Sequence, residues 1–173
     1  MFAVSFSTGK RSLISWAIRK MTGSKVSHAF LAYRDETLDD LWLLEADRGG
    51  FQAQRRAAFE RDNVIVIDVP VDIPIEAVRA ADRWVGDVGY DYEGLIGNAL
   101  AKVANWCRLK VRSVMHSPRS MFCSEAMVRL LQLAKYPGAE KLVPWKETPE
   151  MLLEFMLKDR PDLRAKLAGV SID

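Results

Sequence analysis

The stretch Met121-Phe122-Cys123-Ser124-Glu125-Ala126-Met127-Val128 is the most informative part of the chain. Two apolar residues lead into a cysteine, and the apolar positions after it recur at helical spacing, so we expect a buried helix over residues 121–134. A thiol in the first helical turn lies at the positive end of the helix dipole, near backbone N–H groups without a helical partner. Both effects favour the thiolate. Cys123 is therefore a candidate nucleophile, although an inert buried cysteine would produce the same pattern.

The chain has two histidines, and His28 is the better partner for this cysteine. It lies in a strand expected over residues 25–33, between apolar neighbours such as Val26 and Phe30. A histidine in such a strand is either a hydrogen-bonded core residue or a catalytic base. His116 lies in a polar stretch and is separated from the cysteine by a proline, so we expect it in an exposed loop.

A thiol–imidazole pair usually has a third group that fixes the tautomer of the ring. Glu45 is the candidate for this role, because it follows the apolar run Leu41-Trp42-Leu43-Leu44 in a strand expected over residues 41–46. We expect this strand to be next to the one that carries the histidine. Asp47 and Asp91 are the less favoured alternatives.

The remaining pattern predicts a single α+β domain over residues 1–173, with a small antiparallel sheet packed with helices. Ser12 is the expected N-cap of a helix that ends at Gly23 and has apolar residues, Leu13 and Trp16 among them, at helical spacing. Further strands are expected over residues 2–6, 51–54, 64–69 and 109–115, and further helices over residues 72–89 and 92–106 and, as one long helix, after Thr148.

Two details of this pattern carry more specific expectations. Residues 64–69 form a β-branched run that Pro70 closes, which is typical of a strand buried on both faces. The helix after Thr148 begins with Pro149, a residue suited to the first helical position. No internal repeat, low-complexity tract or linker is present, which is consistent with one domain.

The composition limits the classes of partner. Hydrophobic residues make up 49% and charged residues 28% of 173 residues, as in ordinary globular proteins. The net charge is +2 and the basic residues are scattered, so no nucleic-acid partner is expected. No apolar run is long enough to span a bilayer and the N-terminal segment lacks the pattern of a signal peptide, so we expect a cytoplasmic location. A disulfide between Cys107 and Cys123 is not expected there.

Four segments, taken in order, resemble the motifs of the permuted NlpC/P60 (papain-like) superfamily and of its YiiX/YebB-like members. Ordinary NlpC/P60 peptidases have the cysteine before the histidine, whereas here the histidine comes first, as in a circular permutation. The lecithin:retinol acyltransferase relatives share this permuted order. The resemblance covers roughly residues 10–131 and rests on Ser27-His28-Ala29-Phe30-Leu31, Glu45-Ala46 with Gly50-Phe51, Tyr90-Asp91, and Phe122-Cys123-Ser124-Glu125.

The resemblance implies a circularly permuted papain-like fold and a Cys-His-Glu triad. In that triad Cys123 attacks a carbonyl, His28 transfers protons and Glu45 orients His28. It also implies that Tyr90 and Ser124 line the substrate groove, with Tyr90 assisting oxyanion stabilisation. No metal or cofactor is expected for this chemistry.

The implied activity is that of a cysteine hydrolase, amidase-like or peptidase-like, that cleaves an amide, ester or thioester bond through an acyl-enzyme. Its substrate would be a peptide, an amide or an acyl lipid. The chain lacks the Gly-Asp pair that begins the first strand of the family and any resemblance to a cell-wall-binding module, which places peptidoglycan in doubt as the substrate. Two alternatives remain: an acyltransferase like lecithin:retinol acyltransferase, and a binding module without catalysis on the same fold.

Overall fold

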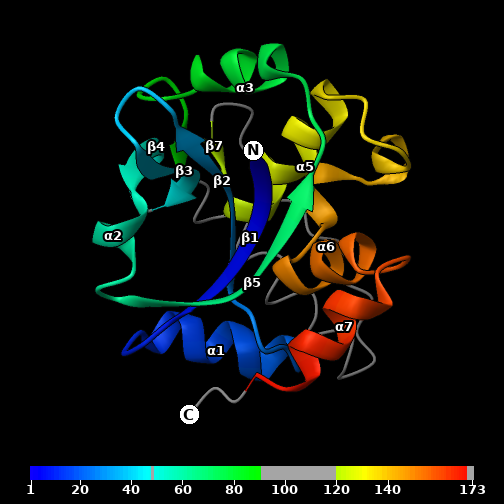
Figure 1. Ribbon diagram of the computed structural model, residues 1–173. Coiled ribbons are helices and arrows are strands. Elements are labelled where there is room, and N and C mark those ends of the chain that lie inside the picture. The colour runs from blue at the N-terminus through cyan, green and yellow to red at the C-terminus, as the bar shows by residue number, and fades with distance from the viewer. Residues whose placement is uncertain (48, 91–119, 171–173) are drawn as a thin grey trace.

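The computed structural model describes residues 1–47, 49–90 and 120–170. Its centre is a five-stranded antiparallel sheet (Figure 1). The strands in spatial order are β4 (Gly50–Arg55), β3 (Asp40–Asp47), β2 (His28–Asp35), β1 (Phe2–Gly9) and β5 (Asn63–Val71). The prediction of an α+β fold with a small antiparallel sheet is confirmed.

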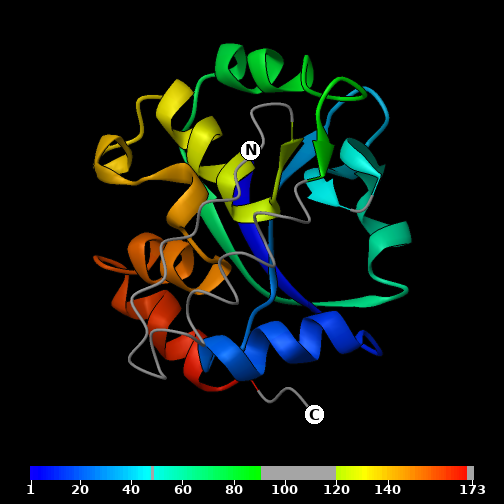
Figure 2. The same ribbon diagram turned by 180° about the vertical axis from the view of Figure 1, so that it is seen from behind.

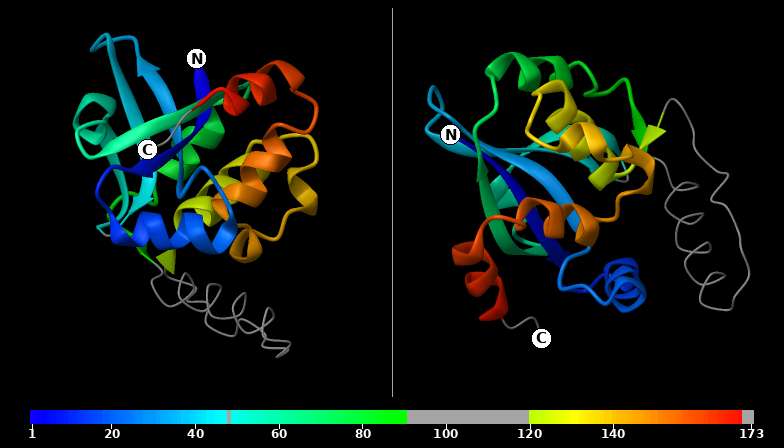
Figure 3. Two further views of the ribbon diagram at one scale, coloured as in Figure 1. Left: turned by 90° about the horizontal axis from the view of Figure 1, so that it is seen from below. Right: turned by 90° about the vertical axis from the view of Figure 1, so that its right-hand side faces the viewer.

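Six α-helices accompany this sheet in the described part of the chain: α1 (Leu13–Thr22), α2 (Arg56–Phe59), α3 (Ile75–Asp82), α5 (Cys123–Leu133), α6 (Pro149–Met156) and α7 (Pro161–Ala168). Helices α3, α5 and α6 contribute side chains to the main core, which they share with one face of the sheet. Figures 2 and 3 show these helices gathered on one side of the strands. Two short 3-10 helices, η1 (Ala139–Lys141) and η2 (Pro144–Lys146), connect α5 to α6.

The capping residues act as the sequence predicts. Ser12 is the N-cap of α1 and its hydroxyl accepts a hydrogen bond from the backbone N–H of Ser15 at 3.2 Å. Gly23, with a φ of 67°, ends this helix in the left-handed conformation. Thr148 caps α6, with Pro149 in the first helical position.

The expectation for residues 64–69 was wrong in two respects. They lie in β5, which is an edge strand, and they range from the exposed Val64 to the buried Val66, Ile67 and Val69 instead of being buried throughout. Pro70 lies inside β5 and does not end it. An edge strand leaves one row of backbone groups without a strand partner, so a proline there costs no sheet hydrogen bond.

Two helices are shorter than predicted. The first, α3, ends at Asp82, and turns lead from it to the short strand β6 (Gly89–Tyr90), which pairs in parallel with β7 (Ser120–Met121). The expected long C-terminal helix is divided into α6 and α7, and Pro161 begins the second of them. The helix predicted over residues 92–106 and the strand over residues 109–115 lie outside the described residues.

Gly50 permits a close approach between β4 and the chain before β6. Its φ is +98°, and a Cβ atom on it would lie 2.6 Å from the carbonyl oxygen of Val88. This oxygen accepts a hydrogen bond from the N–H of Phe51 at 2.9 Å, so it cannot withdraw without loss of that bond. The contact connects the edge of the sheet to the segment that leads toward β7.

We expect Gly50→Ala to lower the free energy of unfolding by about 1–3 kcal/mol, because it adds both backbone strain and a steric clash. Gly23→Ala is the matched control: its φ is also positive, but no atom lies within 4 Å of the added Cβ. Urea denaturation of both variants measures the difference. An equal loss in the two would show that the contact with Val88 contributes nothing to stability.

Candidate active site

The carboxylate of Glu45 and the ring of His28 meet between two neighbouring strands. In the sheet β2 pairs with β3, with Leu31 opposite Leu44. Nε2 of His28 donates a hydrogen bond to Oε2 of Glu45 at 2.6 Å. The Glu45 side chain is fully buried, whereas that of His28 is 16% exposed, so the ring has a route to solvent that the carboxylate lacks.

Two glutamines from the edge strand β4 hold the other carboxylate oxygen. Gln54 donates to Oε1 of Glu45, and Gln52 donates to the same atom at 3.5 Å. Burial by itself would raise the pKa of Glu45, but the hydrogen bond and charge of His28, followed by the bonds from Gln54 and Gln52, lower it. Glu45 is therefore held as a carboxylate in a buried site.

Cys123 is the first residue of α5, as the sequence predicts. It is a free thiol, 3% exposed. Phe122 is the N-cap and has no side chain that could bond the helix, and the first bond of the helix runs from the N–H of Ala126 to the carbonyl of Phe122 at 3.0 Å. The N–H groups of residues 123–125 consequently have no partner within the helix. They point toward the end of α5 at which the thiol lies.

His28 interacts with Cys123 as well as with Glu45. Burial by itself would lower the pKa of His28, but the charge of Cys123 and a hydrogen bond with its side chain, followed by the bond and charge of Glu45, raise it well above 6.5. Because Nε2 is bonded to Glu45, Nδ1 is the ring nitrogen that remains for the thiol. The three side chains form one connected series, with the imidazole in the middle.

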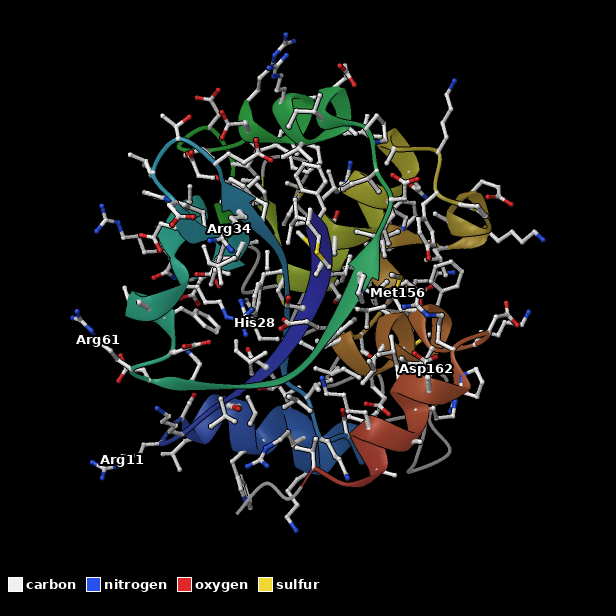
Figure 4. All side chains as sticks on the ribbon, viewed as in Figure 1. Arg11, His28, Arg34, Arg61, Met156 and Asp162 are labelled. Atoms are coloured by element: carbon white, nitrogen blue, oxygen red, sulfur yellow. The ribbon has the colours of Figure 1, made fainter. Side chains whose placement is uncertain are left out.

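Aromatic rings fix the plane of the imidazole. The ring of Phe59 stacks on that of His28 at a centroid distance of 5.9 Å, and the ring of Phe30 lies 5.8 Å away. These two phenylalanines belong to a small cluster on the face of the sheet opposite the main core. Val26, which was predicted to be an apolar neighbour of His28 in the same strand, belongs instead to the main core. Figure 4 shows His28 in the interior, near the strands.

Tyr90 and Ser124 are the two residues that were expected to line the substrate groove. The backbone of Tyr90 pairs with Met121, two residues before Cys123, but the side chain of Tyr90 lies outside the described residues. Ser124 is fully buried, and its hydroxyl donates to the carbonyl oxygen of Glu147 at 2.6 Å. This bond connects α5 to the loop before α6 and does not support a role for Ser124 in binding substrate.

The residues that support His28 and Glu45 were not predicted from the sequence. Gln52 and Gln54 alternate along a predicted strand, and this alternation was the only available signal for them. Nothing local distinguished Phe59 from other apolar residues. Of the weaker candidates, Asp47 is exposed at the end of β3. Asp91, Cys107 and His116 lie outside the described residues.

A polar pocket of about 1170 Å³ borders the Glu45 side of this site. Gln52, Gln54 and Phe59 form one wall, and residues 10–13 form another. A second pocket, of about 1070 Å³, includes Met1 and Phe2 and therefore lies at the opposite end of β1. The first pocket is the one that could hold part of a substrate, because its wall is in contact with His28 and Glu45.

The described residues contain no cluster of three or more His, Cys, Asp or Glu side chains that could hold a metal ion. Within the same ranges, no helix has the length and apolarity that a membrane crossing requires. A scan against protein-family models found no matching family, and searches of curated proteins and of solved structures found no significant match.

Proposed function

We propose that the protein is a cysteine hydrolase that cleaves an amide, ester or thioester bond through an acyl-enzyme. One observation carries the proposal: a buried cysteine at a helix N-terminus interacts with an imidazole whose other side is hydrogen-bonded to a buried carboxylate. A thiol, a base and a group that orients the base are the three parts that nucleophilic catalysis by cysteine needs.

The proposed reaction has two halves. The thiolate of Cys123 attacks the carbonyl carbon, and the free N–H groups at the start of α5 stabilise the oxyanion. The imidazolium of His28 gives its proton to the leaving group as the bond to it breaks, which produces a thioester and a neutral imidazole. His28 then takes a proton from water, the hydroxide attacks the thioester, and the acid and the thiolate–imidazolium pair are released. Glu45 keeps the ring in place throughout.

We also propose that the chain has the circularly permuted papain-like fold of the NlpC/P60 superfamily. The order of the parts supports this: His28 comes first on β2, Glu45 follows on the neighbouring strand β3, and Cys123 comes last at the start of α5. The helix with the cysteine contributes to the same core as the strand with the histidine. A peptide, an amide or an acyl lipid would then be the substrate.

An acyltransferase would use the same acyl-enzyme but release it to an amine or alcohol in place of water. Product analysis of an activated ester, with and without added amine, separates these two activities. A binding module on the same fold would have no need for a reactive thiol. Labelling by a broad-spectrum thiol probe therefore separates an enzyme from a module.

Iodoacetamide at mildly acidic pH is expected to alkylate Cys123 well before Cys107, because an imidazolium and a helix N-terminus stabilise the thiolate of Cys123. Peptide mass spectrometry after short labelling times measures both rates in the same sample. Cys123→Ala, which leaves Cys107 as the single cysteine, is the control for the background rate. Equal rates, or faster labelling of Cys107, would contradict Cys123 as the nucleophile.

A further inference from the structure

Helix α1 presents apolar side chains to solvent. Leu13 is 83% exposed and Trp16 is 54% exposed, and Lys20 is exposed beside them. These three residues are spaced three and four apart, so they lie on one face of the helix. Ser15, on the other side, is buried against Thr8 of β1 at 2.9 Å between the two hydroxyl oxygens. A hydrogen-bonded hydroxyl is therefore part of the contact between α1 and the sheet, on the side opposite Leu13 and Trp16.

The chain around this face is strongly basic. Residues 10–25 contain five basic residues and no acidic one, whereas the 20 basic residues elsewhere are outnumbered by 23 acidic residues. The expectation that the basic residues are scattered was therefore wrong for this segment. The five are Lys10, Arg11, Arg19, Lys20 and Lys25.

The basic side chains differ in how they are held. Lys10 donates to the backbone carbonyls of Glu60 and Arg61, and Lys25 donates to carbonyls at the end of α7. The acceptors in these bonds are carbonyl oxygens and not carboxylates. Arg11 and Lys20 have no ion-pair partner among the described residues. Figure 4 shows Arg11 extending away from the body of the protein.

We propose that this face of α1, which consists of Leu13, Trp16 and Lys20 with Arg11 beside them, docks on an anionic lipid bilayer. A tryptophan and a leucine that project among cations suit the boundary between headgroups and acyl chains. Lysine and arginine residues near such a surface are attracted by its negative potential. Two protruding side chains are too few for a stable interface between two copies of this chain. A nucleic acid backbone would contact the basic residues but would not bury the apolar side chains of Leu13 and Trp16.

Docking in this way would bring the polar pocket to the bilayer. Residues 10–13 form a wall of that pocket and lead directly into the exposed face. Figure 1 shows α1 across one end of the molecule, and Figure 3 shows the same end from below. The inference does not depend on the proposed hydrolase, because binding can be measured without turnover.

Co-sedimentation with vesicles tests the proposal. The intact protein is expected to bind vesicles of phosphatidylcholine mixed with phosphatidylserine and to bind phosphatidylcholine alone much less. Leu13→Gln combined with Trp16→Gln should weaken binding to the mixed vesicles by roughly tenfold or more. Arg11→Gln combined with Lys20→Gln should do the same, and added salt should weaken binding by the intact protein.

Matched controls come from the opposite end of the strands. Leu38, in the turn between β2 and β3, is 57% exposed, and Lys158 is also exposed. Leu38→Gln and Lys158→Gln should bind vesicles as the intact protein does. The proposal is overturned if the intact protein fails to bind mixed vesicles, or if the controls lose as much binding as the α1 variants. It is also overturned if ultracentrifugation shows a dimer that the Leu13 and Trp16 variant abolishes.

Discussion

Replacing His28 with alanine is expected to slow the alkylation of Cys123 at mildly acidic pH by at least about tenfold, or about 1.4 kcal/mol. The reason is that the thiolate loses the imidazolium that stabilises it, while its position at the start of α5 is unchanged. Hydrolysis of an activated ester such as p-nitrophenyl acetate should fall much further, by roughly a thousandfold, because both proton transfers lose their carrier.

The stability of this variant is a second readout. Glu45 would keep its bonds from Gln52 and Gln54 but lose its hydrogen bond from His28, so the free energy of unfolding should fall by about 1–3 kcal/mol. A purely structural histidine predicts a similar loss of stability, and the alkylation rate therefore decides between the two roles. His116→Ala, which removes the only other histidine, is the control and should label at the normal rate.

A His28→Ala protein that melts earlier yet labels at the rate of the unchanged protein would eliminate His28 as the catalytic base. Such a result would leave the helix N-terminus as the source of thiolate stabilisation at Cys123 within the described part of the chain. It would also remove the observation on which the proposed hydrolase rests.

The parts of the site that the sequence predicts are those with a local signal. Cys123 at the start of α5 follows from the helical spacing that begins immediately after it, and Glu45 follows from the apolar run that precedes it. That His28 lies on the neighbouring strand follows from the short connection between the two strands. Each of these signals spans fewer than about ten residues, which is the range over which sequence patterns are informative.

What the sequence did not predict depends on how distant segments dock. Gln54 binds Glu45 only because β4 pairs with β3 in one register, and Phe59 covers His28 only because α2 folds back over the sheet. The edge position of β5 is likewise a property of strand order, which a β-branched run does not encode.

The packing of helix α1 is a second feature that depends on tertiary contacts and that the sequence pattern does not encode. Helical spacing correctly predicted that a helix follows Ser12, but it could not tell which face of the helix is packed. Leu13 and Trp16 would ordinarily be assigned to the core, yet they are exposed, and the buried Ser15 is bonded to Thr8 and Ser27 instead. Hydroxyl pairs of this kind depend on the tertiary contact between α1 and β1.

The buried carboxylate gives the most specific pH prediction. Glu45→Gln is nearly isosteric and can still accept bonds from Gln52 and Gln54, so the fold should survive. The amide carries no charge, however, and with its oxygen on the two glutamines its NH2 group cannot accept the hydrogen bond of the imidazolium. We expect ester hydrolysis to fall by roughly 10- to 100-fold, which is less than for Cys123→Ala.

The same substitution should move the alkaline limit of activity to lower pH. In the unchanged protein burial opposes the charged form of His28, but Cys123 and then Glu45 raise its pKa well above 6.5, so the imidazolium persists as the pH rises. Without the Glu45 charge the pKa falls, and the proton needed by the leaving group is lost at a lower pH. Proton NMR of the two imidazoles, assigned with His116→Ala, follows this shift directly. Asp47→Asn, which removes an exposed carboxylate at the end of the same strand, should leave the pKa of His28 unchanged. If Glu45→Gln kept full activity and an unshifted His28 pKa, the orienting role would pass to another acceptor, such as Asp91 or a main-chain carbonyl.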